Sequence, residues 1–238
     1  MEKAASKTDL RPPVATIVIP TYNQRPEYLR AAVESVLAQT VPVEVLVVDD
    51  GSEPEVECFG GKVIRHRENL GISAALNTGI QNMTAEWFCW LSSDDMIIPE
   101  KIELQLAALK RSGCMASFHR YYVMGGGGQP TAATFPNWPS HKRQKQELGV
   151  GCLINGSTVM IHRSVFDDVG LFDESYKYGQ DWEMWCRISR KYEWLGVNEF
   201  LGTRRTDGNL TELIARDEDM KRVRDAEDRR IRKQYGPA

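Results

Sequence analysis

The sequence predicts a single α/β domain built on a mainly parallel sheet. Residues 14–19 and 43–48 are short apolar runs rich in β-branched side chains, which is typical of strands buried on both faces. Between these runs, apolar residues of the segment 27–39 recur at helical spacing. This strand–helix–strand order implies a right-handed βαβ unit. The chain has 238 residues, no internal repeat and no convincing linker, which favours one domain.

The rest of the first half continues the alternation of strands and helices. Residues 63–66 are predicted as a third, shorter strand, and residues 69–82 as a helix. The apolar run 87–91 suits another buried strand, although periodicity alone does not separate it from a buried helical segment. Residues 100–110 then have clear helical spacing. Such alternation is the signature of an α/β fold with a mainly parallel sheet.

The second half has a weaker pattern. We predict strands at 116–124 and 157–161, a turn of helix at 164–169 and a helix at 181–190. The stretch 129–147 is long, basic and rich in proline, so we interpret it either as a lid over a ligand, carrying His141, or as a solvated loop. Residues 211–235 are highly charged with a sparse apolar seam. They are predicted as one amphipathic helix that packs on the domain or forms a dimer contact.

Composition excludes several classes of protein. The formal net charge of −3 and the sequence pI near 5.9 give no electrostatic reason to bind nucleic acid. Residues 1–13 form a polar segment without a signal core, predicted as a disordered leader, and no run approaches the ~20 apolar residues of a membrane span. The five cysteines are odd in number and lack Cys-x-x-Cys spacing, which favours a reducing compartment. We therefore predict a cytoplasmic protein without a transmembrane segment.

Three acidic turns suggest a common site. Asp49-Asp50 and Asp94-Asp95 each follow a predicted buried strand, and Asp181 opens a predicted helix. Ligands of open α/β sheets bind outside the carboxyl ends of the strands, where acidic residues can hydrogen-bond a nucleoside. The pair Asp94-Asp95 suits a divalent cation, or it caps the helix that follows. A nucleotide contact, a cation and a separate carboxylate base together indicate group transfer from a nucleotide-activated donor.

Five motifs in order resemble the signatures of the family 2 glycosyltransferases, from about residue 14 to residue 211. Each motif alone is a weak signal, whereas five in this order are specific. They are Ile19-Pro20-Thr21-Tyr22-Asn23, Val48-Asp49-Asp50-Gly51-Ser52, Asn69-Leu70-Gly71 with Asn77-Thr78-Gly79, Leu91-Ser92-Ser93-Asp94-Asp95, and Val169-Gly170-Leu171-Phe172-Asp173-Glu174 with Gly179-Gln180-Asp181-Trp182.

The resemblance implies a GT-A fold, which is a three-layer α/β/α sandwich around a mainly parallel mixed sheet. Residues 14–238 would form one domain, with a nucleotide-binding half (14–112), an acceptor-binding half (113–210) and a C-terminal helix (211–238). It also implies roles for site residues. Pro20, Thr21 and Tyr22 would line the base, Asp50 would hydrogen-bond the base with Asp49 beside it, Ser93 would contact the ribose and diphosphate, and Asp94 and Asp95 would bind Mn²⁺ or Mg²⁺.

In the same way, Asp181 matches the general base of inverting members of the family. It would take a proton from an acceptor hydroxyl as that oxygen attacks the sugar. The expected donor is a nucleotide sugar, namely a UDP-sugar. The expected acceptor is a glycan or lipid-linked glycan in polysaccharide or glycoconjugate synthesis, with peripheral membrane association if the acceptor is a lipid. Gly156 and Trp182 are candidates for contact with the acceptor or the donor sugar, although Trp182 is most simply a core residue.

Three positions depart from the family pattern. Ser92 stands where many members have an aspartate, and Gln180 stands where glutamate is common. A histidine found in some relatives near the C-terminus is replaced by Thr206-Asp207. Arg204 and Arg205 could instead meet the diphosphate or face solvent.

Two alternative functions stay open at this point. The first is a non-catalytic nucleotide-sugar-binding partner of another transferase, since an acidic residue is missing at Ser92. The second is a sugar nucleotidyltransferase. Against the second, residues 20–24 lack the glycines and the basic residue of a loop that cradles a triphosphate after the first strand.

Overall fold

The computed structural model describes residues 11–125 and 129–237. The described residues form a nine-stranded sheet in the order β3-β2-β1-β4-β8-β6-β9-β5, with β7 paired to β6 outside this path. The strands are β1 (Ala15–Thr21), β2 (Val43–Asp49), β3 (Lys62–Arg65), β4 (Trp87–Trp90), β5 (Met96–Ile97), β6 (Ala116–Met124), β7 (Thr131–Ala132), β8 (Met160–His162) and β9 (Trp194–Arg205).

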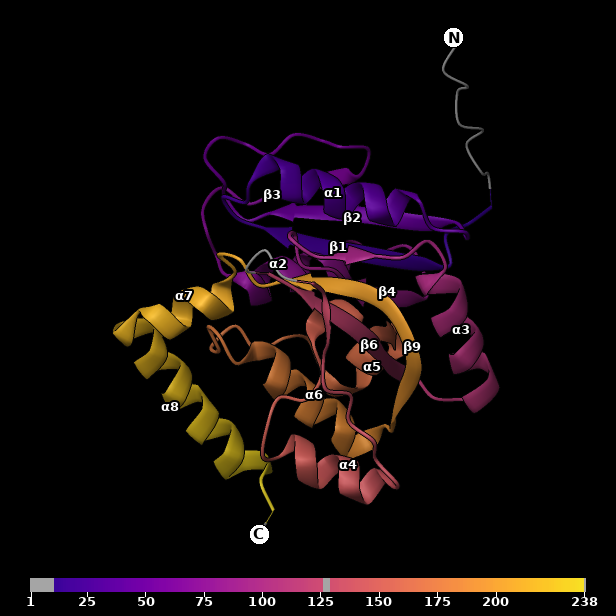
Figure 1. Ribbon diagram of the computed structural model, residues 1–238, viewed down its shortest axis with the longest axis vertical. Helices are drawn as coiled ribbons and strands as arrows, with labels where there is room; N and C mark the ends of the chain where they lie inside the picture. Colours follow the sequence, from indigo (N-terminus) through magenta and orange to yellow (C-terminus); the bar gives the residue numbers. More distant parts are fainter. Residues whose placement is uncertain (1–10, 126–128, 238) are drawn as a thin grey trace.

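Helices cover both faces of this sheet (Figure 1). They are α1 (Pro26–Leu37), α2 (Ile72–Asn82), α3 (Lys101–Ser112), α4 (His141–Leu148), α5 (Arg163–Val169), α6 (Gln180–Lys191), α7 (Leu210–Arg216) and α8 (Glu218–Tyr235), with a short 3-10 helix η1 (Gly156–Thr158).

Alternating side chains of the central strands face two separate cores. Ile17 and Ile19 of β1 pack in one core, together with α1 and α3. Val18, between them, packs in the other core with α2, α5 and α6. Successive side chains of a strand point to opposite faces, so a strand that contributes to two cores is mostly apolar without alternation. The α/β/α layering predicted from the sequence is thereby confirmed.

The two ends of the sheet differ in strand direction. β3, β2, β1 and β4 are parallel to one another. Beyond β4 the pairing is mixed: β8 runs antiparallel to β4 and β6, β9 is parallel to β6, and β5 is antiparallel to β9. The sheet is therefore mixed as predicted, and its run of four neighbouring parallel strands lies in the first half of the chain. The carboxyl ends of β2, β1 and β4 meet at one edge.

The basic stretch 129–147 is mostly exposed coil in its first part and helical in its second. It contains β7 and most of α4, whose first turn is capped by Ser140 Oγ, which accepts from the Arg143 amide at 3.3 Å. His141 Nε2 lies 2.7 Å from the Ser189 carbonyl oxygen of α6, so the segment is fastened to α6. His141 is therefore part of a helix held against α6, and the lid interpretation stays a prediction for residues 129–140.

The C-terminal region also differs from the prediction. The single helix expected at 211–235 is two helices, α7 and α8, because Asp217 adopts an extended conformation and caps α8. Its Oδ1 accepts hydrogen bonds from the amides of Asp219 and Met220. Strand β9 was not predicted at all. Residues 1–10 of the expected leader and residues 126–128 of the glycine run lie outside the described residues.

Candidate functional site

The acidic turns meet at the carboxyl ends of β2, β1 and β4. Thr21, at the end of β1, pairs with Asp49 of β2, and the Leu91 amide after β4 donates to the Val18 carbonyl of β1. The loop after β1 touches both acidic turns. The Asn23 amide donates to Ser52 Oγ at 2.9 Å, and Gln24 Nε2 donates to Ser93 Oγ at 3.3 Å. The expected nucleotide and cation positions are therefore neighbours.

Asp49 has a structural position rather than one beside a bound base. Its side chain is 0% exposed. Its Oδ2 accepts a hydrogen bond from Arg65, and its Oδ1 accepts one from the Ser52 amide at 2.9 Å. With both oxygens engaged inside the protein, Asp49 fixes the turn after β2, and its place beside the base stays a prediction.

Asp50 is also buried and already hydrogen-bonded. It accepts from the amides of Leu70 at 3.0 Å and Gly71 at 2.8 Å, and its Oδ1 lies 2.7 Å from His66 Nδ1. These contacts join the turn after β2 to the start of α2. Oδ2 of Asp50 has one bond in the structure, and a carboxylate oxygen can accept a second. That free lone pair is the part of Asp50 that remains for a base.

The three residues predicted to line the base are not equivalent. Pro20 and Thr21 belong to β1 and are buried, whereas Tyr22 directly after β1 is 51% exposed. An exposed aromatic ring at the carboxyl end of a parallel sheet can stack on a nucleobase. Tyr22 is therefore the member of this group with a free face for a ligand. Thr21 Oγ1 is buried and has no hydrogen-bond partner among the described residues.

Asp95 is the buried member of the second acidic pair. Its Oδ2 accepts from Ser157 Oγ at 2.6 Å, and its Oδ1 accepts from the Arg205 amide at 2.9 Å. Burial, and then the neighbouring Asp94 carboxylate, raise the pKa of Asp95 to about 7. Burial also raises the pKa of Asp94, against the opposing effect of Arg204 and Arg205.

This pair fits a hard divalent cation. Two adjacent carboxylates with raised pKa values repel each other when both are ionised, and a bound cation would relieve that repulsion. In residues 11–125 and 129–237, no group of three or more His, Cys, Asp or Glu side chains is arranged to hold a metal. Mg²⁺ and similar ions are commonly bound by one or two carboxylates together with substrate phosphates and water. Asp94 and Asp95 would supply the protein's share of such a shell.

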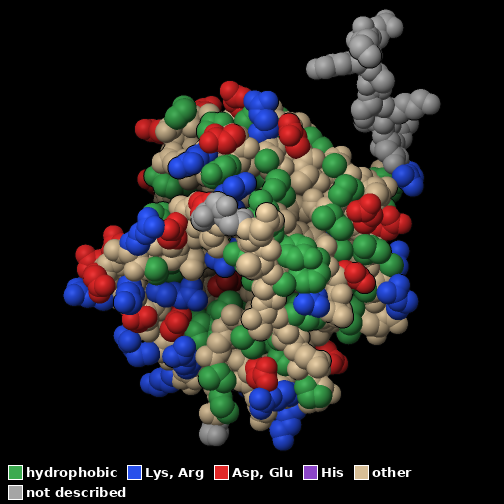
Figure 2. Space-filling view, viewed as in Figure 1, with side chains coloured by type: hydrophobic (Ala, Val, Ile, Leu, Met, Phe, Trp, Pro, Cys, Tyr) green, Lys and Arg blue, Asp and Glu red, His purple; other side chains and the backbone are tan. Residues whose placement is uncertain are grey.

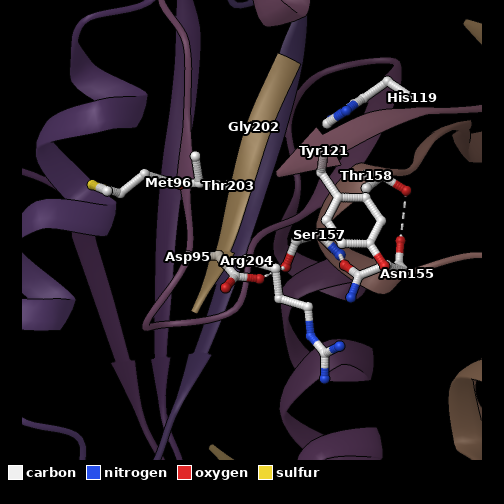
Figure 3. Close-up of a pocket in the computed structure, with 10 residues that line it drawn as sticks. All are labelled: Asp95, Met96, His119, Tyr121, Asn155, Ser157, Thr158, Gly202, Thr203 and Arg204. Atoms are coloured by element: carbon white, nitrogen blue, oxygen red, sulfur yellow. Dashed lines mark hydrogen bonds between the residues drawn. The ribbon is translucent and has the colours of Figure 1, made fainter. Parts of the chain in front are cut away.

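Sequence reasoning missed the polar residues behind Asp95. A small cavity of about 10 Å³ lies there, close to the space of one water molecule. Figure 3 shows its lining, with Asp95 and Ser157 joined by a hydrogen bond and with Arg204 beside them. His119 Nε2 also belongs to this region and has no partner among the described residues. No local pattern marks these residues, because Ser157 lies 62 positions after Asp95.

Asp181 lies in the first turn of α6, and its side chain is only partly exposed. Its Oδ1 accepts from the Trp182 amide at 2.7 Å, and Cys152 Sγ lies 3.7 Å from its Oδ2. Burial raises the pKa of Asp181, and the guanidinium of Arg224 opposes that effect. A carboxylate with a raised pKa is a stronger proton acceptor than an ordinary aspartate.

One short segment links Asp181 to the acidic pair. Cys152 contacts Asp181, and Ser157 contacts Asp95. An extended chain spans at most about 3.6 Å per residue, so the Cα atoms of Cys152 and Ser157 are no more than about 18 Å apart. Asp95 and Cys152 both act electrostatically on Tyr121, so Asp181, which contacts Cys152, lies on the same side of the domain as the pair although 86 positions separate them in sequence. Figure 2 shows a hollow on the viewed face beside α7 and α8, where Lys and Arg side chains gather.

The two candidates for sugar contact have structural positions. A Cβ atom on Gly156 would lie 2.4 Å from two carbons of the Trp90 ring, so Gly156 lets η1 rest directly on that ring. Trp182 is 1% exposed, its Nε1 donates to the Leu148 carbonyl oxygen at 2.5 Å, and Arg232 lies over its ring. Trp182 therefore packs as a core residue in this structure, and its contact with a sugar stays a prediction.

The fold and this acidic edge define a class of protein: an α/β protein that binds a ligand outside the carboxyl ends of its parallel strands. Comparison with known proteins is more specific. The model of Glycosyl transferase family 2 matches residues 16–170. This chain belongs to that family.

Relatives and solved structures agree with this assignment. An uncharacterised glycosyltransferase of Rickettsia prowazekii is 35% identical over 198 residues, which cover 77% of this chain and 61% of the relative. A putative teichuronic acid biosynthesis glycosyltransferase of Bacillus subtilis, TuaG, is 28% identical over 210 residues, which cover 83% of this chain and 81% of TuaG. The crystal structure of S. aureus TarS 1-349 in complex with UDP-GlcNAc superposes with a TM-score of 0.68 at 17% identity, covering 88% of this chain and 64% of TarS 1-349.

The TarS likeness shows the fold. The chain spans about three fifths of the length of the Rickettsia prowazekii relative. Within the described residues, no helix has the length and apolar character needed to cross a membrane.

Proposed function

We propose that this protein transfers a sugar from a UDP-sugar to an acceptor hydroxyl, with inversion at the anomeric carbon, in polysaccharide or glycoconjugate synthesis. One observation carries this proposal: the segment from Cys152 to Ser157 brings a carboxylate base, Asp181, near the acidic pair at the donor edge. Family membership supports glycosyl transfer. The name of TuaG supports a polysaccharide pathway, and the UDP-GlcNAc bound to TarS supports a UDP-sugar.

In this proposal the donor lies along the carboxyl ends of β1, β2 and β4. The exposed ring of Tyr22 stacks on the uracil, and the free lone pair of Asp50 Oδ2 accepts a hydrogen bond from the base. Ser93, held by Gln24, faces the ribose and diphosphate. A Mg²⁺ or Mn²⁺ ion at Asp94 and Asp95 would neutralise charge on the departing diphosphate.

The arginines after β9 are the second source of positive charge at this edge. Arg205 donates its amide to Asp95, and its guanidinium lies over the Tyr28 ring with its central carbon 4.2 Å from the ring centroid. Arg204 acts electrostatically on both Asp94 and Asp95. Both positions suit contact with a diphosphate, since guanidinium groups bind phosphate oxygens in a fixed geometry. They take the place of the histidine that this chain lacks.

Asp181 is the proposed general base. Its raised pKa favours proton uptake from an acceptor hydroxyl, and the hydroxyl oxygen then forms a bond to the anomeric carbon as the bond to the diphosphate oxygen breaks. A single displacement from the opposite face inverts the configuration. Asp181 must be ionised before it can accept the proton, so activity depends on its deprotonated form.

A second candidate function is a non-catalytic nucleotide-sugar-binding partner of another transferase. It is favoured by the position of Ser92, whose hydroxyl lies 3.1 Å from Ser157 Oγ, so a structural contact stands where many members carry a carboxylate. Membership of a glycosyl transferase family argues against the sugar nucleotidyltransferase alternative.

The test measures thermal stability against a panel of nucleoside diphosphates and UDP-sugars with Mn²⁺, Mg²⁺ or EDTA, followed by transfer assays with glycan and lipid-linked acceptors. A ligand that binds the folded state raises the melting temperature. We expect a UDP-dependent shift that EDTA abolishes, that Asp94→Asn loses and that Asp181→Asn keeps, together with transfer that Asp181→Asn loses. No shift with any nucleotide contradicts the donor site, whereas a shift without transfer to any acceptor supports the non-catalytic partner.

A further inference from the structure

Helix α8 contacts the residues on both sides of Asp181. We propose that α8 is the positioning element of the catalytic base, and that Glu227 is the positioning residue that holds the loop before Asp181 through its backbone amides. This inference rests on the proposed function, because it assigns a role relative to Asp181 as a base. The family model ends at residue 170, so both Asp181 and α8 lie outside the matched part.

Glu227 makes an unusual set of contacts for a glutamate on a highly charged helix. Its side chain is 8% exposed, and its two oxygens accept from the amides of Lys177 at 2.5 Å, Tyr178 at 2.9 Å and Gly179 at 2.8 Å. Gly179 immediately precedes α6 and offers no side chain to cap that helix. The amide groups at a helix N-terminus need outside partners when they are buried. Glu227, from another helix, supplies the partner of the Gly179 amide, which lies two residues before Asp181.

Three further residues of α8 hold the same segment. Arg224 Nη1 donates to the Tyr178 carbonyl oxygen at 2.5 Å. Ile231 is fully buried, and its Cδ1 lies 3.1 Å from the position of a Cβ on Gly179. The central guanidinium carbon of Arg232 lies 5.4 Å from the centroid of the Trp182 ring.

These positions share one face of α8. Residues 224, 227, 231 and 232 follow the i, i+3, i+7, i+8 pattern of an inward helical face. That face therefore touches residues 178, 179 and 182, which flank Asp181 in sequence. The sparse seam seen in the sequence is thus only part of the buried face, since Arg224 and Glu227 belong to it as well.

Arg224 also sets the charge around Asp181. The ionisable groups that act on Asp181 are Arg224 from α8, Cys152 from the segment before η1, and Cys186 one turn later on α6. Arg224 is the cation among these three groups. Its own guanidinium is fixed by Asp228, whose Oδ1 accepts from Arg224 Nε at 2.7 Å. A fixed cation favours the ionised carboxylate against the effect of burial.

A base must be placed accurately to act. Misplacement of a reacting group by about 1 Å can cost about 100-fold in rate. Glu227→Gln keeps one acceptor oxygen and turns the other into an NH2 donor, so it removes part of the amide contacts two to four residues before Asp181, which is a change of that kind. A merely structural α8 would instead lower stability and donor binding without a selective effect on turnover.

The experiment compares Glu227→Gln with Glu218→Gln, which makes the same chemical change at an exposed position of the same helix. We expect Glu227→Gln to lower kcat by about 10- to 100-fold while the KM for the UDP-sugar changes less than about twofold. Glu218→Gln should match the unaltered protein. Hydrogen exchange at the amides of residues 177–179 should accelerate in Glu227→Gln, whereas exchange in β1 and β2 should not.

A second pair of variants tests the charge. Arg224→Gln should raise the pKa of Asp181 and move the acid limb of the rate profile to higher pH, and Arg224→Lys should restore most of this. NMR titration of the Asp181 carboxyl group in the same variants measures this change in pKa directly and does not require an active enzyme. Unchanged exchange at residues 177–179 together with an unmoved Asp181 titration overturns the inference, even in an active enzyme. If exchange and the Asp181 titration change in the variants as expected but the unaltered protein transfers no sugar, the proposed function is contradicted and the positioning role is not.

Discussion

Gly156 is the residue whose substitution most directly tests the packing beneath the donor edge. Its φ angle is not in the left-handed region, so alanine suits the backbone and the whole cost of Gly156→Ala is steric. The added Cβ would lie 2.4 Å from Cε3 and Cζ3 of Trp90, whereas carbon atoms pack at about 3.5–4.0 Å. Either the backbone at residue 156 or the Trp90 ring must therefore move by about 1 Å.

Trp90 cannot easily yield. Its ring is buried and meets Phe172 edge-on, with ring centroids 6.2 Å apart at an interplanar angle of 86°. Overpacking of this kind costs about 1–3 kcal/mol. For a chain of 150–250 residues each kcal/mol lowers Tm by about 2–4 °C, so we expect Gly156→Ala to lower Tm by about 2–12 °C. The displaced η1 also carries Ser157 away from Asp95, so UDP should stabilise the variant less.

The assay is urea and thermal unfolding with a matched control. Gly151→Ala is that control, because a Cβ at Gly151 meets nothing within 4 Å. Trp90→Leu, which removes the ring, is combined with Gly156→Ala in a double-mutant cycle. The cost of Gly156→Ala should be smaller in the Trp90→Leu background, with a coupling of about 0.5–3 kcal/mol. Equal costs for the two alanine variants, or no coupling to Trp90, would refute the reasoning.

Three further outcomes are expected. Arg65→Met leaves the buried Asp49 carboxylate without its cation and should lower the free energy of unfolding by about 3 kcal/mol, the low end of the usual cost of breaking a buried ion pair. Urea unfolding measures this loss, with the exposed Arg67→Met as the control. Asp181→Asn should raise Tm, because burial raises the folded-state pKa of Asp181 and the unaltered protein loses stability as pH rises through that value. The gain in Tm over the unaltered protein should be larger at pH 8 than at pH 4, and an equal gain at both pH values would contradict this. The transfer rate should fall as pH falls through the same raised pKa, and a rate that is flat on the acid side would argue against Asp181 as the base.

The parallel half of the sheet could be predicted because its physics is local. Strands β1 and β2 are buried along most of their length and are mostly apolar, so the pattern needs no knowledge of partners. Asp49 and Asp50 lie at the end of β2, and Asp94 and Asp95 follow shortly after β4, which is another parallel strand. Their position at one edge of the sheet therefore follows from the parallel topology alone.

Strand β9 and helix α4 could not be predicted in the same way. The pairing of β6 with β9 is irregular on both sides of Arg120, and Asn198 and Glu199 fall in the skipped part of the register, which breaks the alternation of apolar and polar residues. In α4 only Gln144 and Leu148 are buried, so its inward face has almost no apolar signal. Both elements form because of partners elsewhere in the fold.

Site residues were predictable in type but not always in role. Asp49 and Asp50 are adjacent in the same sequence motif. The contact with Arg65, sixteen positions later, is what makes Asp49 an internal group. The support of Asp181 is more distant, since Glu227 lies 48 positions after the Gly179 amide that it accepts from. Such partners are separated by too many residues for a local pattern to reveal them.

Strand β5 has a consequence for any attempt to exchange parts between relatives. It follows Asp95 directly, yet its only strand partner in the described sheet is β9, through Met96 with Thr203 and Ile97 with Gly202. The turn that carries Asp94 and Asp95 is thus anchored on one side by β4 and on the other by β9, whose paired residue Gly202 lies 105 positions after Ile97. A chimera joined near residue 112 would separate that turn from its second anchor. An exchange of segments between relatives therefore has to keep β9 together with the first half of the chain, whose acidic turn it anchors.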